Sequence, residues 1–161
     1  MVTGELRAVQ RSRVATEEPG LALQIPVQEG QAVKKGDLLA QLDPGRLETE
    51  LKQTEADRLV AAANVTEREA EVEWRKHELE NHRALAQGGA GKAKELYDAE
   101  MEVRTAAARL ESAKRTVDTM LAREELLRKR IADTAIVAPF DGVIVSKAAE
   151  EGEWVAEGAA V

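Results

Sequence analysis

The sequence predicts an α+β fold in which a small β-sandwich is split in two by a long antiparallel α-helical coiled-coil hairpin. Three observations support this prediction. Two similar β-type segments lie near the two ends of the 161-residue chain, the residues between them show a seven-residue repeat, and only 2% of the residues are aromatic. So few aromatic residues leave little with which to build a wide globular core, and the bias toward Ala, Leu, Glu and Arg is typical of long helices.

The β-type segments form an internal repeat. Residues 20–39 align with residues 142–161 at a constant offset of 122, from Gly20 to Gly142. The other aligned pairs are Glu29 with Glu151, Gly30 with Gly152, Val33 with Val155 and Gly36 with Gly158. Each copy reads as strand, Glu-Gly turn, short strand, Gly turn and strand. Because one such copy cannot bury its own apolar face in water, we expect residues 20–43 and residues 134–161 to form one sandwich.

The segment between the copies, residues 44–133, predicts two helices. Asp43 is a good N-cap and Pro44 suits the first helical position, so the first helix begins there and runs to about Gln87. Glycines then stop it, and a second helix runs from about Lys92 to Asp133. Each helix is ~60 Å long at 1.5 Å per residue. The short connection makes them antiparallel, with a tip at about residues 86–92.

Apolar residues at heptad spacing predict the seam between the helices. In the second helix, one seam position holds Leu96, Val103, Leu110, Val117, Glu124 and Ile131, and the other holds Ala99, Ala106, Ala113, Met120 and Leu127. In the first helix, one position holds Leu51, Arg58, Val65, Val72, Leu79 and Ala86. Glu124 and Arg58 are the exceptions, and the sequence does not define the second seam position of the first helix.

The composition and the short motifs argue against several classes of function. A net charge of −7 without a basic block excludes nucleic acid as a partner. His77 and His82 are five residues apart, ~140° around a helix, so they cannot share one metal ion. Residues 88–93 resemble a phosphate-binding loop but follow a helix and lack the hydroxyl residue after Lys92. We therefore expect no catalytic residues, no cofactor and no metal, and no enzymatic activity.

Two segments resemble the half-motifs of a known protein family. They are residues 27–43 (VQEGQAVKKGDLLAQLD) and residues 136–144 (IVAPFDGVI). With the long helices between them, the chain resembles the membrane-fusion proteins, or periplasmic adaptors, of the HlyD-like and efflux-pump kind. The resemblance implies that the sandwich is a split lipoyl/biotinyl-like domain. It also implies that residues 1–19 contribute a strand segment to a neighbouring β-barrel domain, which would mostly lie beyond Val161.

The resemblance implies a role in bacterial export or efflux. Such adaptors are anchored to the inner membrane, lie in the periplasm, assemble into a homo-oligomeric ring (a hexamer or a trimer) around an inner-membrane transporter, and reach an outer-membrane channel. It assigns the docking role to the hairpin tip, which here contains Leu85, Gln87, Gly88, Gly89 and Lys92. Channel-docking tips carry an Arg, a Leu and a Ser; Leu85 matches the Leu, whereas Asn81 and Lys92 stand at the other two positions.

Two other functions remain open. A biotin or lipoate carrier needs a modifiable Lys at the turn after Asp43, where this chain instead opens into a helix. A coiled-coil scaffold unrelated to export would leave the internal repeat unexplained. Two side chains also have alternative roles. Leu85 either docks a partner or caps the end of the coil, and Trp74 either contacts a partner or covers the seam.

Overall fold

The computed structural model describes residues 11–88 and 92–161. Its elements follow one another as β1 (Gly20–Gln24), β2 (Ala32–Val33), β3 (Leu38–Leu42), α1 (Gly45–Gln87), α2 (Ala93–Asp133), β4 (Ala135–Val137), β5 (Gly142–Val143) and β6 (Trp154–Val155). Strands thus precede and follow a pair of long helices, which confirms the predicted fold class. Within the described ranges, no helix combines the length and the apolar character needed to cross a bilayer.

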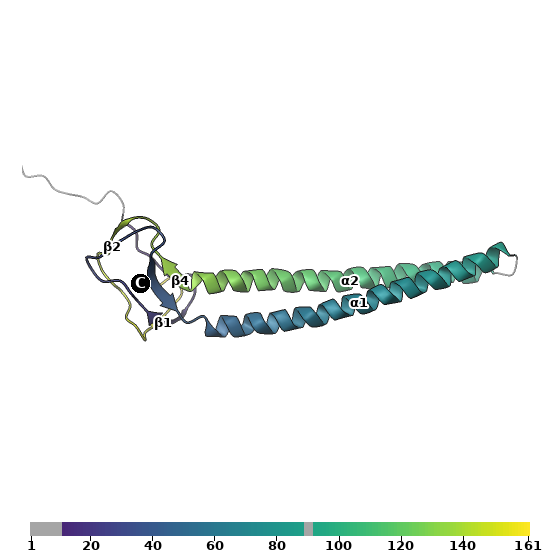
Figure 1. Cartoon of the computed structure of the whole chain (residues 1–161), viewed down its shortest axis with the longest axis horizontal. Helices are drawn as coiled ribbons and strands as arrows, with labels where there is room; N and C mark the ends of the chain where they lie inside the picture. Colours follow the sequence, from purple (N-terminus) through teal and green to yellow (C-terminus); the bar gives the residue numbers. More distant parts are fainter. Residues whose placement is uncertain (1–10, 89–91) are drawn as a thin grey trace, which may run out of the picture. The chain divides into compact units, whose positions relative to one another are not determined.

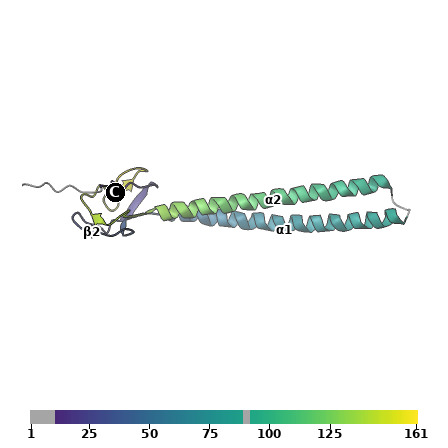
Figure 2. The same ribbon diagram turned by 90° about the horizontal axis from the view of Figure 1, so that it is seen from above.

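The chain divides into two compact units. The β unit contains the residues up to Thr49 together with Leu127–Val161, and the helical unit contains Glu50–Leu126. Figures 1 and 2 both show α1 and α2 side by side along their length. The strands of the β unit form a four-stranded sheet in the order β4-β3-β1-β6 and a two-stranded sheet of β2 and β5.

The two repeat copies pair reciprocally. β1 is antiparallel to β6, with Gly20 opposite Val155, and β2 is antiparallel to β5, with Val33 opposite Gly142. These two pairings are equivalent under the offset of 122 residues, since Gly20 aligns with Gly142 and Val33 aligns with Val155. Each copy therefore uses its first strand to pair with the second strand of the other copy, as a pseudo-twofold axis requires.

Main-chain hydrogen bonds repeat the same symmetry. The N–H of Ala22 donates to the carbonyl of Glu153 at 2.9 Å, and its counterpart Ile144 donates to the carbonyl of Gln31 at 3.0 Å. Gln31 and Glu153 are themselves counterparts in the repeat. Neither copy can satisfy these backbone groups alone, and leaving such groups buried without partners costs free energy. We therefore expect that the two halves need each other to fold.

The glutamates of the two Glu-Gly turns also accept hydrogen bonds from the backbone of the opposite half. The carboxylate of Glu151 accepts a hydrogen bond from the N–H of Ile25 at 2.9 Å, and Glu29 accepts one from the N–H of Lys147 at 3.0 Å. The following residue in each turn, Gly30 or Gly152, has a φ of 82° or 83°. Side chains disfavour this left-handed conformation, so glycine follows the glutamate in both turns.

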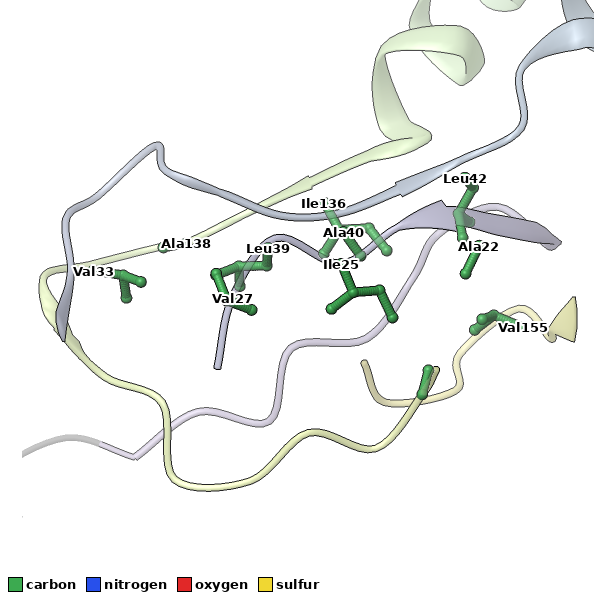
Figure 3. Packing of buried hydrophobic residues seen from close by; sticks show 11 residues of the cluster. Ala22, Ile25, Val27, Val33, Leu39, Ala40, Leu42, Ile136, Ala138 and Val155 are labelled. Carbon is green, nitrogen blue, oxygen red and sulfur yellow. The ribbon is translucent and has the colours of Figure 1, made fainter. Parts of the chain in front are cut away.

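The core of the β unit is formed by side chains from both halves (Figure 3). Leu42 of β3 is fully buried and lies opposite Ala22 of β1, while Ala40 of β3 lies opposite Ile136 of β4, which comes from the far end of the sequence. Its members are small or branched aliphatic residues, namely Ala22, Ile25, Val27, Val33, Leu39, Ala40, Leu42, Ile136, Ala138, Ala149 and Val155. Such a core is consistent with the small number of aromatic residues.

The helices begin and end close to the predicted residues. The N–H of Gly45 donates to the side chain of Asp43 at 2.8 Å, and the N–H of Glu48 donates to the carbonyl of Pro44 at 2.9 Å. Asp43 therefore caps α1 and Pro44 occupies its first turn. α1 ends at Gln87, as predicted, and α2 begins at Ala93, one residue later than predicted.

The segment before β1 pairs with the C-terminal residues of the β unit from residue 14 onward. Ala15 forms a bridge with Ala160, and the N–H of Thr16 donates to the carbonyl of Ala159 at 3.1 Å. This bridge is the counterpart of Leu38 opposite Val137 in the repeat. Residues 14–16 thus pair within the β unit, whereas the sequence analysis assigned residues 1–19 to a neighbouring domain. Residues 1–10 lie outside the described part of the chain.

Glu18 and Arg130 form a bidentate ion pair in the β unit, and it makes stability depend on pH. Two guanidinium nitrogens of Arg130, Nε and Nη2, each donate to one carboxylate oxygen of Glu18 at 2.7 Å. These hydrogen bonds, helped by the positive charge of Arg130, lower the pKa of Glu18. A lowered folded-state pKa contributes stability that is present at neutral pH and is lost as the pH falls below the ordinary glutamate value toward the folded value.

We expect Glu18→Gln to destabilise the β unit at neutral pH and to have a smaller effect under acid conditions. Equilibrium unfolding between pH 7 and pH 2 measures this difference. Arg130→Ala should remove the same acid-sensitive contribution, and the double variant should cost less than the sum of the two single variants. An effect of Glu18→Gln that is equally large at pH 7 and at pH 2 would contradict the assignment.

Candidate partner-docking hairpin

The seam of α2 is most closely packed along its alanines. Ala99, Ala106 and Ala113 are buried, as is Leu127 at the same heptad position further along. The predicted seam residues at the other position, Leu96, Val103, Leu110 and Val117, are half-buried. Small side chains let two helices approach closely, with the larger residues packing beside them. The helix contact is therefore centred on the alanine position.

The structure defines the second seam position of α1, which sequence reasoning could not. Residues at heptad spacing along this position are buried or half-buried, namely Leu47, Thr54, Ala61, Arg68, Arg75 and His82. Four of these six residues are polar or charged, so hydropathy gives no signal. Arginine side chains can cover apolar surface with their aliphatic stems while the guanidinium reaches water or a carboxylate. The Thr54 hydroxyl donates to the carbonyl of Glu50 at 2.9 Å.

The two residues that break the heptad pattern contact each other. The guanidinium Nε of Arg58 in α1 lies 2.7 Å from Oε1 of Glu124 in α2. Glu124 is only 2% exposed, whereas Arg58 is partly exposed at the side of the seam. A carboxylate buried this deeply needs such a partner, because an uncompensated charge in an apolar contact is costly. The pair therefore links the two helices at one defined register.

Further ion pairs join the helices on both sides of the seam. They are Glu71–Arg109 and Glu50–Arg123 on one side, and Glu69–Lys114 and Arg83–Glu100 on the other. Each pair is exposed enough that it contributes at most about 1 kcal/mol. Their value is in orientation, since opposite charges meet only when the helices are antiparallel and in this register. The hairpin is therefore specified by electrostatics as well as by packing.

The predicted tip residues lie at the end of the hairpin formed by the C-terminus of α1 and the N-terminus of α2. Leu85 is 55% exposed, and Gln87 and Gly88 are exposed beside it. Lys92 is exposed as well, and its ammonium lies 3.3 Å from the carboxylate of Glu95. Gly89, which was also predicted to dock a partner, lies outside the described residues. An apolar side chain left open to water at this position is available to a partner.

Two further apolar side chains near the tip were missed by the sequence analysis. Tyr97 and Met101 in α2 are exposed. They are four residues apart, so they lie on one face of the helix. Their positions fall outside the seam, and the only sequence signal was the isolated tyrosine next to Leu96. Tyrosine is enriched at protein–protein contacts, where its ring buries area and its hydroxyl keeps a polar partner.

Trp74 lies in α1 before the tip residues, on the N-terminal side of Leu85, and its side chain is exposed. The guanidinium carbon of Arg75 lies 4.2 Å from the centroid of its ring, which is a cation–π contact. Arg75 also lies 2.7 Å from Glu102 of α2. The ring thus stacks on a residue that bridges the helices, which fits the seam-covering role, while its outer surface stays open.

Within the described residues, no cluster of three or more His, Cys, Asp or Glu side chains could hold a metal ion.

Comparison with known proteins identifies the family. Residues 11–161 match the family model described as "RND MFP, barrel-sandwich hybrid domain", where MFP denotes membrane fusion protein. The macrolide export protein MacA of Escherichia coli O157:H7 is 26% identical over 155 residues, which cover 96% of this chain and 42% of MacA. A UPF0194 membrane protein of Acidithiobacillus ferridurans is 27% identical over 190 residues, which cover 91% of this chain and 55% of that protein.

The fold is shared with a solved structure. The crystal structure of MacA from Actinobacillus actinomycetemcomitans superimposes with a TM-score of 0.86 at 22% identity, covering 92% of this chain and 46% of that one. The chain spans about half the length of the curated relatives that it matches. The predicted resemblance is confirmed: this chain belongs to the membrane fusion protein family and has the barrel-sandwich hybrid domain of its RND members.

Proposed function

We propose that the chain is part of a periplasmic adaptor that bridges an inner-membrane transporter toward an outer-membrane channel in an export system. The β units assemble into a homo-oligomeric ring, and the hairpin tip docks the next component. The parent protein is anchored to the inner membrane. Membership of the membrane fusion protein family supports this proposal, as does the likeness to MacA, whose name describes macrolide export. The related protein MdtA is named for multidrug resistance.

The observation that carries the docking role is the exposure of apolar side chains at the end of the hairpin. Leu85 at the C-terminal end of α1 and Tyr97 near the start of α2 are both more than half exposed. The folded hairpin gains little from either side chain, because neither is buried in the seam. Hot spots of protein interfaces are enriched in aromatic residues such as Tyr that fill a pocket on the partner, and Leu85 adds apolar area at the same end of the hairpin.

The charge next to the tip supports a polar rim around these apolar residues. Lys92 extends from the start of α2, and its contact with Glu95 is exposed and therefore weak. A partner carboxylate could replace Glu95 at little cost. Interfaces typically combine an apolar centre with a charged, solvated rim, which sets the approach rate and the specificity of the partner.

We expect the double variant Leu85→Ser/Lys92→Glu of the full-length protein to lose most export activity and most crosslinking to the channel. Loss of a hot spot weakens binding by about 2 kcal/mol, or about 30-fold. Helicity and Tm should change little, because both side chains are exposed. Export of a dye or drug, crosslinking to the channel, and circular dichroism are the measurements.

The matched control combines Leu59→Ser with Lys52→Glu, two exposed residues of α1 far from the tip in sequence. It makes the same chemical changes and should leave export intact. If the tip variant exports normally but melts several degrees lower, Leu85 caps the end of the coil and docking lies elsewhere. If both double variants lose export equally, the effect is not specific to the tip.

A further inference from the structure

Both helices of the hairpin carry large apolar side chains that point away from the seam. In α1, Val60 is 72% exposed and Trp74 is 57% exposed, and in α2, Leu126 is 57% exposed. None of the three occupies a seam position, so the hairpin itself does not bury them. Exposed apolar side chains that gather along one face of a protein typically mark a contact with another molecule.

These residues belong to a second stripe on each helix, on the side opposite to the seam. We call these stripes the outward faces. Their members are Ala56, Val60, Ala63, Glu67, Ala70 and Trp74 in α1, and Ala108, Ser112, Arg115, Thr119, Ala122 and Leu126 in α2. All of these side chains are exposed. Their spacing alternates between four and three residues, as in the seam of a coiled coil, so each outward face is shaped to pack against another helix.

We propose that the outward face of α1 packs against the outward face of α2 in a second copy of this chain. This inference rests on the proposed homo-oligomeric ring, because cyclic symmetry places all copies at one height. Within a hairpin, the contact between Arg58 and Glu124 relates the heights of the two helices. Val60 lies two residues after Arg58 in the sequence. Ala122 lies two residues before Glu124, so it is at about the same height as Val60.

At this register, a large side chain of one outward face lies opposite a small side chain of the other. The facing pairs are Ala56 with Leu126, Val60 with Ala122, and Trp74 with Ala108. Alanines let two helices approach closely, and the larger residue of each pair then fills the space that the alanine leaves. The contact therefore buries the apolar side chains that one hairpin alone leaves exposed.

The charges of the two outward faces are also complementary. Glu67 is the charged residue of the α1 face and lies opposite Arg115, the charged residue of the α2 face. Arg115 lies 2.8 Å from Glu111 within α2, but both side chains are at least 60% exposed, so this pair is weak and can be exchanged. α1 contains ten acidic and seven basic residues, so a contact between two α1 faces would bring like charges together. The charges thus favour α2 of the second copy over its α1.

Disulfide crosslinking between copies tests the proposal, since the natural chain has no cysteine. One variant carries Val60→Cys and another carries Ala122→Cys, and the two are mixed and oxidised. A disulfide forms readily only where the two Cα atoms come within about 7 Å. We expect this mixture to form a linked dimer at least tenfold faster than a control mixture of Val60→Cys with Ala108→Cys. The control moves the second cysteine by two heptads along the same face.

Charge reversal at Glu67 and Arg115 provides a second measurement. Glu67→Arg in the Val60→Cys chain should slow the linkage about tenfold, because two arginines then face each other. Arg115→Glu in the Ala122→Cys chain should restore the rate, since it returns opposite charges to the pair. Circular dichroism of each variant should match that of the natural chain, because every substituted side chain is exposed.

Two results would overturn the proposed contact. One is equal linkage in the matched and the control mixtures. The other is linkage of the Val60→Cys variant with itself at the rate of the matched mixture, which would indicate a contact between two α1 faces. Sedimentation distinguishes this failure from that of the ring. A chain that assembles without the expected linkage keeps the ring and loses only this contact, whereas a chain that stays monomeric at high concentration contradicts both.

Discussion

Replacing Arg58 by alanine is expected to destabilise the helical hairpin by about 3 kcal/mol. The substitution removes the guanidinium that lies 2.7 Å from the Glu124 carboxylate, and Glu124 is 2% exposed. Breaking a buried ion pair from one side typically costs 3–5 kcal/mol, and the partial exposure of Arg58 places the value at the lower end. Urea unfolding followed by circular dichroism measures the loss.

Replacing both charged residues distinguishes the loss of the ion pair from the loss of side-chain packing. Changing Arg58 and Glu124 together to leucine should restore stability or exceed that of the natural chain, because a buried ion pair can often be replaced by apolar residues. Arg115→Ala, which removes an exposed arginine paired within α2, should stay within about 0.5 kcal/mol. A similar small effect for Arg58→Ala would mean that the pair does not hold the seam together.

The contact between Arg58 and Glu124 was not predicted from the sequence. The heptad pattern identified Arg58 and Glu124 separately as interruptions, since hydrophobic periodicity is a property of one helix at a time. Whether two interruptions meet depends on the register between helices, which the turn and the packing of the whole hairpin determine. Opposite charges at the two exceptions were a usable signal. Combined with the antiparallel prediction, it could have located the register.

The sequence predicted more of the β unit than of the contacts in the hairpin seam. The alignment of Gly20 with Gly142 identified two equivalent halves, and the structure pairs them reciprocally. The pairing partners themselves were not predictable, because each copy offers two short strands and alternation does not say which edges meet. Residues 14–16 were predicted as part of a strand segment, but the resemblance assigned that segment to a neighbouring domain, and the sequence gives no sign that Ala15 bridges Ala160.

The tip was predicted from glycines and from one exposed leucine, and its other apolar residues were not. Tyr97 and Met101 lie outside the heptad stripe, so the periodicity that revealed the seam assigned them no role. A docking surface is defined by what the folded chain leaves uncovered, which appears only once burial is known. The exposed fraction of each side chain is therefore the information that the sequence could not supply.

Val155→Asp is expected to unfold the β unit as a whole, including the half from the other end of the chain. Val155 is 4% exposed and lies opposite Gly20 of β1, so the new carboxylate enters the common core. A charge buried without a partner costs several kcal/mol, which is comparable to the total stability of a small domain. Amide exchange at Ala22 and Leu42 should accelerate together with exchange at Ile136.

The matched control is Val145→Asp, the same substitution in the same half at a side chain that is 72% exposed. It should change the free energy of unfolding by no more than about 0.5 kcal/mol. The amides of the helical unit should stay protected in both variants, because Glu50–Leu126 forms a compact unit of its own. If Val155→Asp accelerated exchange in residues 142–155 alone and left Ala22 protected, the halves would fold separately. Reciprocal strand pairing would then not be the source of their stability.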